Sequence, residues 1–233
     1  MGLGSLDHPA ELDPPYLFAD YTSTVLRSPG KALVVPPAGC SELTGPQFGE
    51  GDVRETDADL TRHGDGDPLG ERIIVHGRVT DSYGKPVANS LVEVWQANAA
   101  GRYIHQLDQH PAPLDPNFVG AGRALTDDEG RYRFVTIKPG PYPWRNHSNA
   151  WRPAHIHFSL FGRAFTQRLV TQMYFPGDPL FFQDPIFNGV RDEAARKRMI
   201  SSYDHQTTVE EWATGYRFDI VLGGAAATPV EGS

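Results

Sequence analysis

The sequence has little of what disulfide frameworks, thiolate metal sites and membrane spans require. Cys40 is the single cysteine among 233 residues, which excludes a disulfide framework and a cysteine cage for a metal. No apolar run reaches the roughly 18–20 residues that a membrane helix needs. The first residues lack the basic and apolar regions of a secretory signal peptide. We therefore expect a cytoplasmic protein that does not enter a membrane.

The sequence also has fewer basic than acidic residues. The 21 Lys and Arg residues are outnumbered by 29 Asp and Glu residues, and the formal net charge is -8 at pH 7. The basic residues form no strong cluster, which argues against a nucleic-acid or anionic-membrane partner. The chain also has no glycine-rich phosphate loop, no Cys-x-x-Cys pair and no Gly-x-Ser-x-Gly elbow. Nucleotide binding and serine hydrolysis therefore receive little support.

What the sequence does have is material for turns and for a sizeable core. It holds 24 Gly and 20 Pro, which favour turns and extended connections over long helices. Apolar residues make up 39%, with 12 Phe, 9 Tyr and 4 Trp. Residues 1–70 are rich in Pro, Gly and acidic residues and have no sustained periodicity, so we expect an extended N-terminal arm there. We expect residues 71–233 to form one catalytic domain.

Residues 71–233 show short apolar or alternating segments separated by turn signals. Such a pattern predicts an all-β protein, a β-sandwich with one or two short helices. The one helical spacing lies at residues 191–203, where Ala194, Ala195 and Met199 recur at helical intervals. The expected strands lie at residues 72–80, 90–97, 155–160, 169–175 and 216–222, with a strand, turn and second strand at 125–136.

Two histidines in the expected strand at 155–160 are the strongest chemical signal. Side chains in a strand alternate between faces, so His155 and His157 point the same way, roughly 6–7 Å apart along the chain. Ile156 and Phe158 then face a core. Two imidazoles on one rigid face can chelate a transition metal. Alone, the pair is equally compatible with one hydrogen-bonded core histidine and one solvated histidine.

Tyrosines supply a second kind of donor. Tyr142 stands between Pro141 and Pro143, which hold it in an extended geometry, and Tyr103 lies in a long connection between strands. Each taken singly is compatible with a tyrosine packed on a loop. Two phenolates together with two imidazoles, however, would suit ferric iron better than zinc or copper.

Residues 151–158, Trp-Arg-Pro-Ala-His-Ile-His-Phe, resemble the iron-binding motif of the intradiol ring-cleaving dioxygenases. Residues 95–103 and 138–146 resemble the same family closely, and the resemblance extends over roughly residues 21–222. The Pro-rich arm favours the protocatechuate-cleaving branch over the catechol branch, whose members usually carry a helical N-terminal region. A Gly common in the family after Trp-Arg-Asn is replaced here by His147.

The resemblance implies a non-haem Fe(III) centre with four protein ligands. Tyr142 and His157 would be the axial pair, and Tyr103 and His155 would lie in the equatorial plane with a hydroxide. Tyr142 would also take part in catalysis, and Arg152 would stabilise negative charge on the bound substrate. The residues expected to bind or surround the substrate are Tyr21, Arg27, Trp144, Gln172 and Ile186, with Gln172 as the hydrogen-bonding support of Arg152.

The implied reaction uses O2 to open protocatechuate between its two hydroxyl-bearing carbons, giving 3-carboxy-cis,cis-muconate. The resemblance further implies that the chain is the iron-bearing beta subunit of a higher oligomer of alpha/beta units. One alternative is intradiol cleavage of catechol, hydroxyquinol or a substituted catechol. Another is a non-catalytic binding module, because residues 75–81 and 84–87 also resemble transthyretin-like β-sandwiches.

Overall fold

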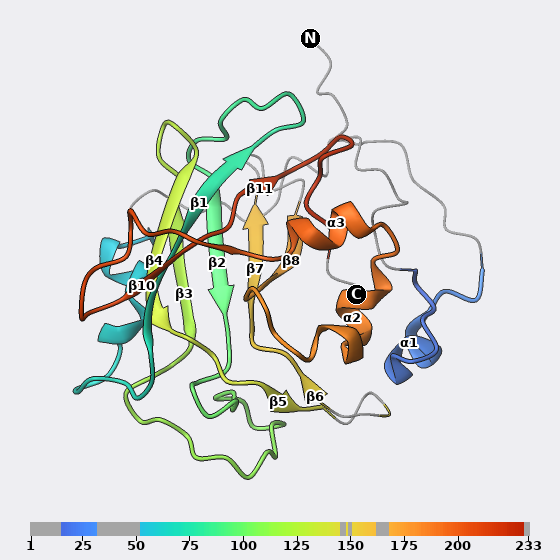
Figure 1. Ribbon diagram of the computed structural model, residues 1–233, viewed down its shortest axis with the longest axis horizontal. Coiled ribbons are helices and arrows are strands. Elements are labelled where there is room, and N and C mark those ends of the chain that lie inside the picture. The colour runs from blue at the N-terminus through green and yellow to red at the C-terminus, as the bar shows by residue number, and fades with distance from the viewer. Residues whose placement is uncertain (1–14, 32–51, 145–147, 149–150, 162–167, 231–233) are drawn as a thin grey trace.

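Two β-sheets packed face to face form the body of the chain (Figure 1). The computed structural model describes residues 15–31, 52–144, 148, 151–161 and 168–230. The prediction of an all-β sandwich with few short helices is confirmed. His147 and Cys40 lie outside the described residues.

The larger sheet is organised around β1 (Arg72–Thr80). On one side β1 pairs antiparallel with β4 (Arg131–Ile137), and on the other it pairs parallel with β10 (Thr214–Arg217) and β11 (Ile220–Val221). The short strand β9 (Ser202–Tyr203) closes the far edge beside β10. The segment expected as one strand at 216–222 is therefore two short strands in register with successive parts of β1.

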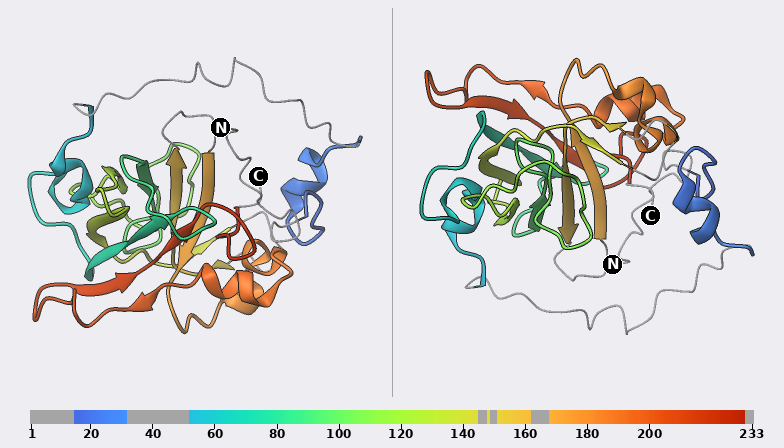
Figure 2. Two further views of the ribbon diagram at one scale, coloured as in Figure 1. Left: turned by 90° about the horizontal axis from the view of Figure 1, so that it is seen from above. Right: turned by 90° about the horizontal axis from the view of Figure 1, so that it is seen from below.

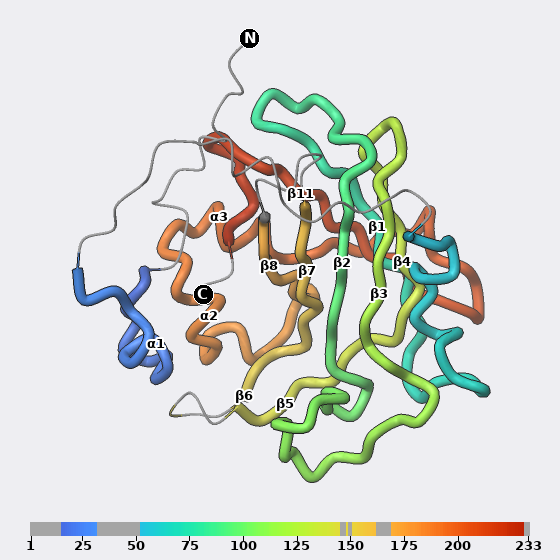
Figure 3. Tube along the Cα trace, turned by 180° about the vertical axis from the view of Figure 1, so that it is seen from behind, coloured from blue at the N-terminus to red at the C-terminus, as the bar shows by residue number. Residues whose placement is uncertain are grey.

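The smaller sheet is antiparallel and has the order β3-β2-β7-β8. Its strands are β3 (Ala121–Leu125), β2 (Leu91–Trp95), β7 (His155–Phe161) and β8 (Arg168–Tyr174). A separate pair, β5 (Tyr142–Pro143) with β6 (Trp151–Arg152), lies beyond the end of this sheet, as the view from behind shows (Figure 3). This pair was not expected from the sequence.

The space between the sheets is filled by one apolar cluster, to which both contribute. Val75, Phe134 and Tyr216 come from the larger sheet, and Ile156 and Phe158 come from β7. Burial of these side chains is the main favourable term in folding and fixes which face of each strand points inward. The opposite face of β7 is thereby left for polar side chains.

The helices are short and lie outside the two layers. They are α1 (Thr22–Arg27), α2 (Pro185–Gly189) and α3 (Glu193–Arg198), and all three lie toward the same side of the sandwich in each view (Figures 1 and 2). The described residues thus contain three α-helices, where one or two were expected. No helix among the described residues is both long enough and apolar enough to cross a membrane.

The helix expected at 191–203 is shorter than its apolar spacing suggested. It begins at Glu193, after its N-cap Asp192, and ends at Arg198. Beyond it, Met199 O accepts a hydrogen bond from Tyr174 N at 2.8 Å, and Ser201 N donates to Tyr174 O at 2.9 Å. The backbone after α3 therefore continues along the edge of β8 because its hydrogen-bonding groups pair there.

Part of the expected N-terminal arm belongs to the packed body. The 3-10 helices η4 (Glu55–Ala58) and η5 (Leu60–Arg62) pack on β3 and β4, and Leu60 is fully buried in the central cluster. The division of the chain at residue 70 stays a prediction.

Candidate metal centre

The two histidines of β7 lie side by side on the face that turns away from the core. Their ring centroids are 4.9 Å apart, as strand alternation predicts. Cross-strand neighbours complete this face: Tyr174 lies opposite His155, while Trp95 and Gln172 lie on either side of His157. The Trp95 ring stacks on His157 with centroids 4.7 Å apart and an interplanar angle of 4°, which fixes the plane of that imidazole.

His155 is held as a neutral imidazole with a defined tautomer. Nδ1 lies 2.7 Å from the carbonyl oxygen of Pro153, which can only accept, so Nδ1 carries the proton. Burial lowers the pKa of His155 well below its usual value, and the nearby Arg152 and His157 act in the same direction. The lone pair therefore resides on Nε2, which is the arrangement a metal-binding histidine needs.

The two predicted tyrosines meet this histidine face from separate loops. The hydroxyl oxygen of Tyr142 lies 3.5 Å from His155 Nε2. The Tyr103 ring contacts the Tyr142 ring edge-on with centroids 5.4 Å apart, and its centroid is 6.3 Å from that of His157. The structure thus brings together all four residues that the sequence predicted as ligands.

Close approach of two backbone segments brings Tyr103 to Tyr142, and two glycines allow it. A Cβ on Gly101 would lie 2.2 Å from Pro141 O, and one on Gly140 would lie 2.4 Å from Ala99 O. Asn98 joins the segments, because its backbone oxygen accepts from Gly101 N and Gly140 N. The role of these residues was missed in the sequence, although glycines close to the two predicted ligand tyrosines are a signal for such contacts.

The donor set fits a ferric ion. Ligands about 2.0–2.2 Å from one ion can be separated by the 3.5 Å measured between Tyr142 oxygen and His155 Nε2. Among the described residues no group of three His, Cys, Asp or Glu is placed to hold a metal, and the two histidines together with the two tyrosines offer four donor atoms here. Phenolate oxygen with imidazole nitrogen is a donor set for an oxidised, hard cation.

A cavity of about 780 Å³ opens onto this centre. Tyr103, Tyr142 and His157 line it together with Trp95 and Trp144. Its size and its aromatic walls suit a small planar ligand. The remaining lining comes from the loop after Tyr103 and from β5: His105, Leu107, Asp108, Gln109, His110, Pro111 and Pro143.

Arg152 lies behind the centre in a buried polar network. Only 2% of its side chain is exposed, and its Nη2 donates to Gln172 Oε1 at 2.6 Å, the contact predicted from the sequence. Nη1 donates to His155 Nε2 at 3.0 Å and to Tyr142 oxygen at 3.4 Å. Binding of a metal to Nε2 would replace the first of these hydrogen bonds.

Two members of this network were missed in the sequence. Asp184 pairs with Arg152 through Nη2 and Oδ2 at 2.9 Å, and Tyr174 oxygen lies 3.0 Å from the same Nη2. Burial is the largest single influence and acts to lower the pKa of Arg152, but the charge of and hydrogen bond to Asp184, together with Tyr142 and Tyr174, outweigh it, and the pKa is raised well above its usual value. Asp184 precedes Pro185, a helix-start signal that gives no hint of its contact with Arg152.

The expected substrate residues form a connected row toward α1. Trp144 lies over the Arg152 guanidinium at 5.4 Å and contacts the Tyr21 ring at 4.8 Å. Arg27 Nη2 donates to the Tyr21 hydroxyl at 3.0 Å. These contacts link Arg27 to Arg152 through Tyr21 and Trp144. Ile186 is buried beside Asp184, to which its backbone N–H donates at 3.1 Å.

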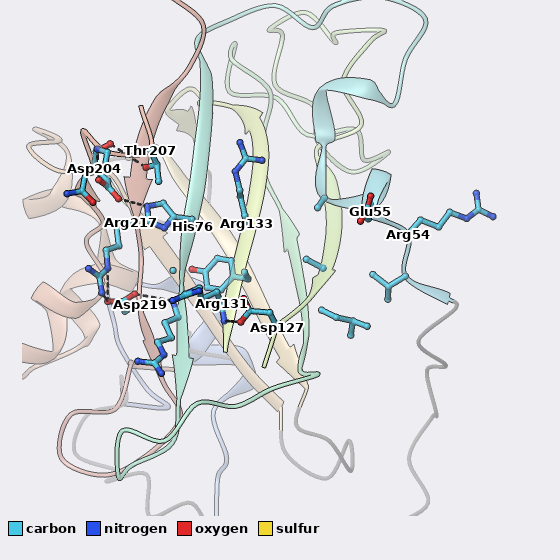
Figure 4. A pocket seen from close by; sticks show the side chains of 18 residues that line it. Arg54, Glu55, His76, Asp127, Arg131, Arg133, Asp204, Thr207, Arg217 and Asp219 are labelled. Carbon is cyan, nitrogen blue, oxygen red and sulfur yellow. Dashed lines mark hydrogen bonds and ion pairs between the residues drawn. The ribbon is translucent and has the colours of Figure 1, made fainter. Parts of the chain in front are cut away.

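A larger cavity, about 1050 Å³, lies on the outer face of the larger sheet (Figure 4). Several of its charged side chains pair within the cavity, His76 with Asp204 at 2.8 Å and Arg217 with Asp219 at 2.6 Å. None of the predicted site residues lines it. Its chemistry is that of a compensated charged surface, so the smaller aromatic cavity is the better candidate site.

Comparisons with known proteins show the family to which the chain is related. A family model described as "Dioxygenase" matches residues 43–224, and one described as "Protocatechuate 3,4-dioxygenase beta subunit N terminal" matches residues 14–37. The protocatechuate 3,4-dioxygenase beta chain of Burkholderia cepacia is 60% identical over 220 residues, which cover 94% of this chain and 93% of that protein. The alpha chain from Pseudomonas putida is 33% identical over 164 residues, 70% of this chain and 76% of that protein.

A solved structure extends the likeness to the fold. The crystal structure of 3-chlorocatechol 1,2-dioxygenase from Rhodococcus opacus 1CP matches with a TM-score of 0.57 and 27% identity. The match covers 78% of this chain and 71% of that chain.

Proposed function

Because this chain belongs to the dioxygenase family, and within it to the protocatechuate 3,4-dioxygenase beta chains, we propose that it cleaves the ring of protocatechuate with O2. The ring would open between its two hydroxyl-bearing carbons, giving 3-carboxy-cis,cis-muconate. Membership of this family of enzymes disfavours the alternative of a non-catalytic binding module. The 60% identity to a protocatechuate enzyme favours protocatechuate over catechol or hydroxyquinol.

The observation that carries the proposal is the convergence of two phenols and two imidazoles at the end of one cavity, where His155 lies directly behind Tyr142. Tyr142 oxygen and His155 Nε2 are 3.5 Å apart, and Tyr103 and His157 line the same cavity wall. These four residues would hold Fe(III). When bound, a ferric ion draws electron density from a coordinated catechol ring and makes the ring reactive toward O2.

The chain's own residues would handle the protons and charge of the substrate. Tyr142 oxygen, at the cavity wall, would take a proton from a substrate hydroxyl. Arg152 Nη1 donates toward that same oxygen at 3.4 Å, so it would stabilise the negative charge that this proton transfer leaves on the substrate. Trp95 keeps the His157 plane fixed by stacking.

The aromatic residues near the entrance would exclude water and orient the ring. Trp144 contacts both Arg152 and Tyr21, which makes it a wall between the centre and α1. Arg27, hydrogen-bonded to Tyr21, would supply positive charge for the substrate carboxylate. Gln172 and Ile186, behind Arg152 and beside Asp184, would complete the pocket from the rear.

We further propose that this chain works in an assembly with an alpha chain. The support is the relation to two kinds of chain whose names pair them, a beta chain at 60% identity and an alpha chain at 33% identity. The iron-bearing role falls to this chain because it carries Tyr103, Tyr142, His155 and His157.

The test is oxygen consumption by the co-expressed alpha and beta chains. We expect a red-brown protein with about one iron per beta chain and oxygen uptake with protocatechuate far faster than with catechol or hydroxyquinol. Turnover of catechol without turnover of protocatechuate would overturn the substrate. A colourless protein with stoichiometric iron would overturn Tyr103 and Tyr142 as ligands.

A further inference from the structure

Asp184 forms a two-point ion pair with one edge of the Arg152 guanidinium. Oδ2 lies 2.9 Å from Nη2, and Oδ1 lies 3.3 Å from Nε. Neither side chain is accessible to any useful extent, with exposed fractions of 0% for Asp184 and 2% for Arg152. A two-point contact of this kind fixes the plane and the direction of a guanidinium, which a single hydrogen bond does not.

The two hydrogen bonds from Arg152 to Asp184 determine which N–H groups of Arg152 point toward Tyr142 and His155. Nε and Nη2 are occupied by Asp184, Gln172 and Tyr174. Only Nη1 is turned toward Tyr142 oxygen and His155 Nε2. The position of Asp184 therefore determines the direction in which Arg152 presents its remaining donor.

Asp184 is itself held rigidly. Its Oδ1 also accepts from Ile186 N at 3.1 Å, as the N-cap of α2, and its Oδ2 accepts from the Tyr174 hydroxyl at 2.9 Å. Its backbone oxygen accepts from Asn188 N at 3.0 Å and from Asn188 Nδ2 at 2.8 Å. The Tyr174 hydroxyl has a single proton, which it can donate to Asp184 Oδ2 or to Gln172 Oε1 at 2.8 Å. The contacts of Asp184 with Arg152 Nε, Arg152 Nη2 and Ile186 N remain in either case and hold the carboxylate in one orientation.

We propose that Asp184 is a positioning residue for Arg152, which it holds so that Nη1 meets Tyr142, with the Tyr174 hydroxyl as the link that keeps the Asp184 carboxylate in place. The role rests on the proposed function, because the consequence for turnover passes through Arg152. Asp184 also cancels the charge of Arg152 within the buried network. Arg152 then acts on Tyr142 as an oriented donor rather than as an uncompensated cation beside a metal.

The primary variant is Asp184→Asn in the assembled enzyme. Asn keeps the size of the side chain and the oxygen that accepts from Ile186 N as the N-cap. It removes the negative charge and one of the two hydrogen bonds that Asp184 accepts from Arg152. We expect kcat to fall roughly 10- to 100-fold, the range for residues that orient a metal-site group, while KM changes less than about threefold because Arg152 does not line the cavity.

Asp192→Asn is the matched control, since Asp192 caps α3 through Ala195 N and lies outside the Arg152 network. It should leave kcat unchanged.

A double-mutant cycle distinguishes positioning from a general structural role. In an Arg152→Met background, adding Asp184→Asn should change kcat less than about threefold. Thermal unfolding of the iron-free proteins gives a readout without turnover: the double variant should unfold at a higher temperature than the Arg152→Met single variant, because the lone buried carboxylate is then removed. Should the Asp184→Asn protein fail to fold, Tyr174→Phe replaces it. We then expect kcat to fall roughly 3- to 10-fold when Arg152 is present and not to fall when Arg152 is already replaced by Met.

An equal loss of kcat in both backgrounds would overturn the proposal, as would a double variant less stable than both single variants. A wild-type enzyme that does not consume oxygen with protocatechuate would refute the proposed function instead. The stability ordering of the iron-free proteins would still report whether Asp184 and Arg152 are coupled.

Discussion

Replacing Gly101 with Ala should damage the candidate centre more than the fold. Gly101 has φ of 78°, in the left-handed region, and an added Cβ would lie 2.2 Å from the backbone oxygen of Pro141. A carbon–oxygen contact is normally no closer than about 3.3 Å. The Gly101 segment and the segment that carries Tyr142 must therefore separate by about 1 Å, and Tyr103 moves with the first of them.

Gly84 provides a control with the same backbone geometry. Its φ is also 78°, but an added Cβ there would meet nothing within 4 Å. Gly84→Ala therefore costs only the left-handed conformation, about 1–2 kcal/mol, or roughly 2–8 °C in Tm for a chain of this size. Gly101→Ala adds the steric displacement to the same cost, and a 1 Å misplacement of reacting groups can lower the rate by about 100-fold.

The assay compares the two variants in Tm, iron content, visible absorption and oxygen uptake with protocatechuate. We expect Gly84→Ala to match the wild type in everything but Tm. Gly101→Ala should lose the tyrosinate charge-transfer band in part and turn over about 100-fold more slowly. If the two variants behave alike in all four measurements, the close approach at Gly101 does not hold the tyrosines together.

Three further substitutions test separate contacts. His155→Ala should lose its iron, because the hydrogen bond from Nδ1 to Pro153 O leaves the lone pair of His155 on Nε2, where it can bind a metal. Unchanged metal content by elemental analysis would contradict the role of His155 as a ligand. Tyr142→Phe should keep most of the iron but slow substrate binding and product release in stopped-flow measurements; equal rates would rule out the Tyr142 oxygen as a proton acceptor. The Asp57→Asn variant addresses η4, because the hydrogen bond from Arg123 lowers the pKa of Asp57 against the opposing effect of burial. The wild-type Asp57 carboxylate therefore stabilises the folded protein above the unfolded-state pKa of about 3.9, and this stabilisation is lost as pH falls through the lower pKa of the folded state. Chemical denaturation should show a deficit below about 1 kcal/mol at pH 7 that closes below about pH 4, and a deficit independent of pH would contradict the ion pair.

Local patterns were sufficient for most of the strands. The expected strands at 72–80 and 155–160 coincide with β1 and β7 within a residue, because alternating or continuous apolar residues report directly on burial. The same reasoning overextended the helix at 191–203. Met199 is buried, as the helical spacing implied, but the backbone after Arg198 pairs with the edge of β8 instead.

The sequence by itself determined that His155 and His157 share a strand face, because side chains alternate, and that a single cysteine cannot form a thiolate cage. Only the tertiary structure decided how distant segments meet those histidines. Asp184 lies 32 residues from Arg152 in the chain, and Gly101 approaches Pro141 although β3 and β4 lie between them in the sequence. Periodicity states which face of an element is buried, whereas the partner of that face depends on how separate elements pack, which no local pattern encodes.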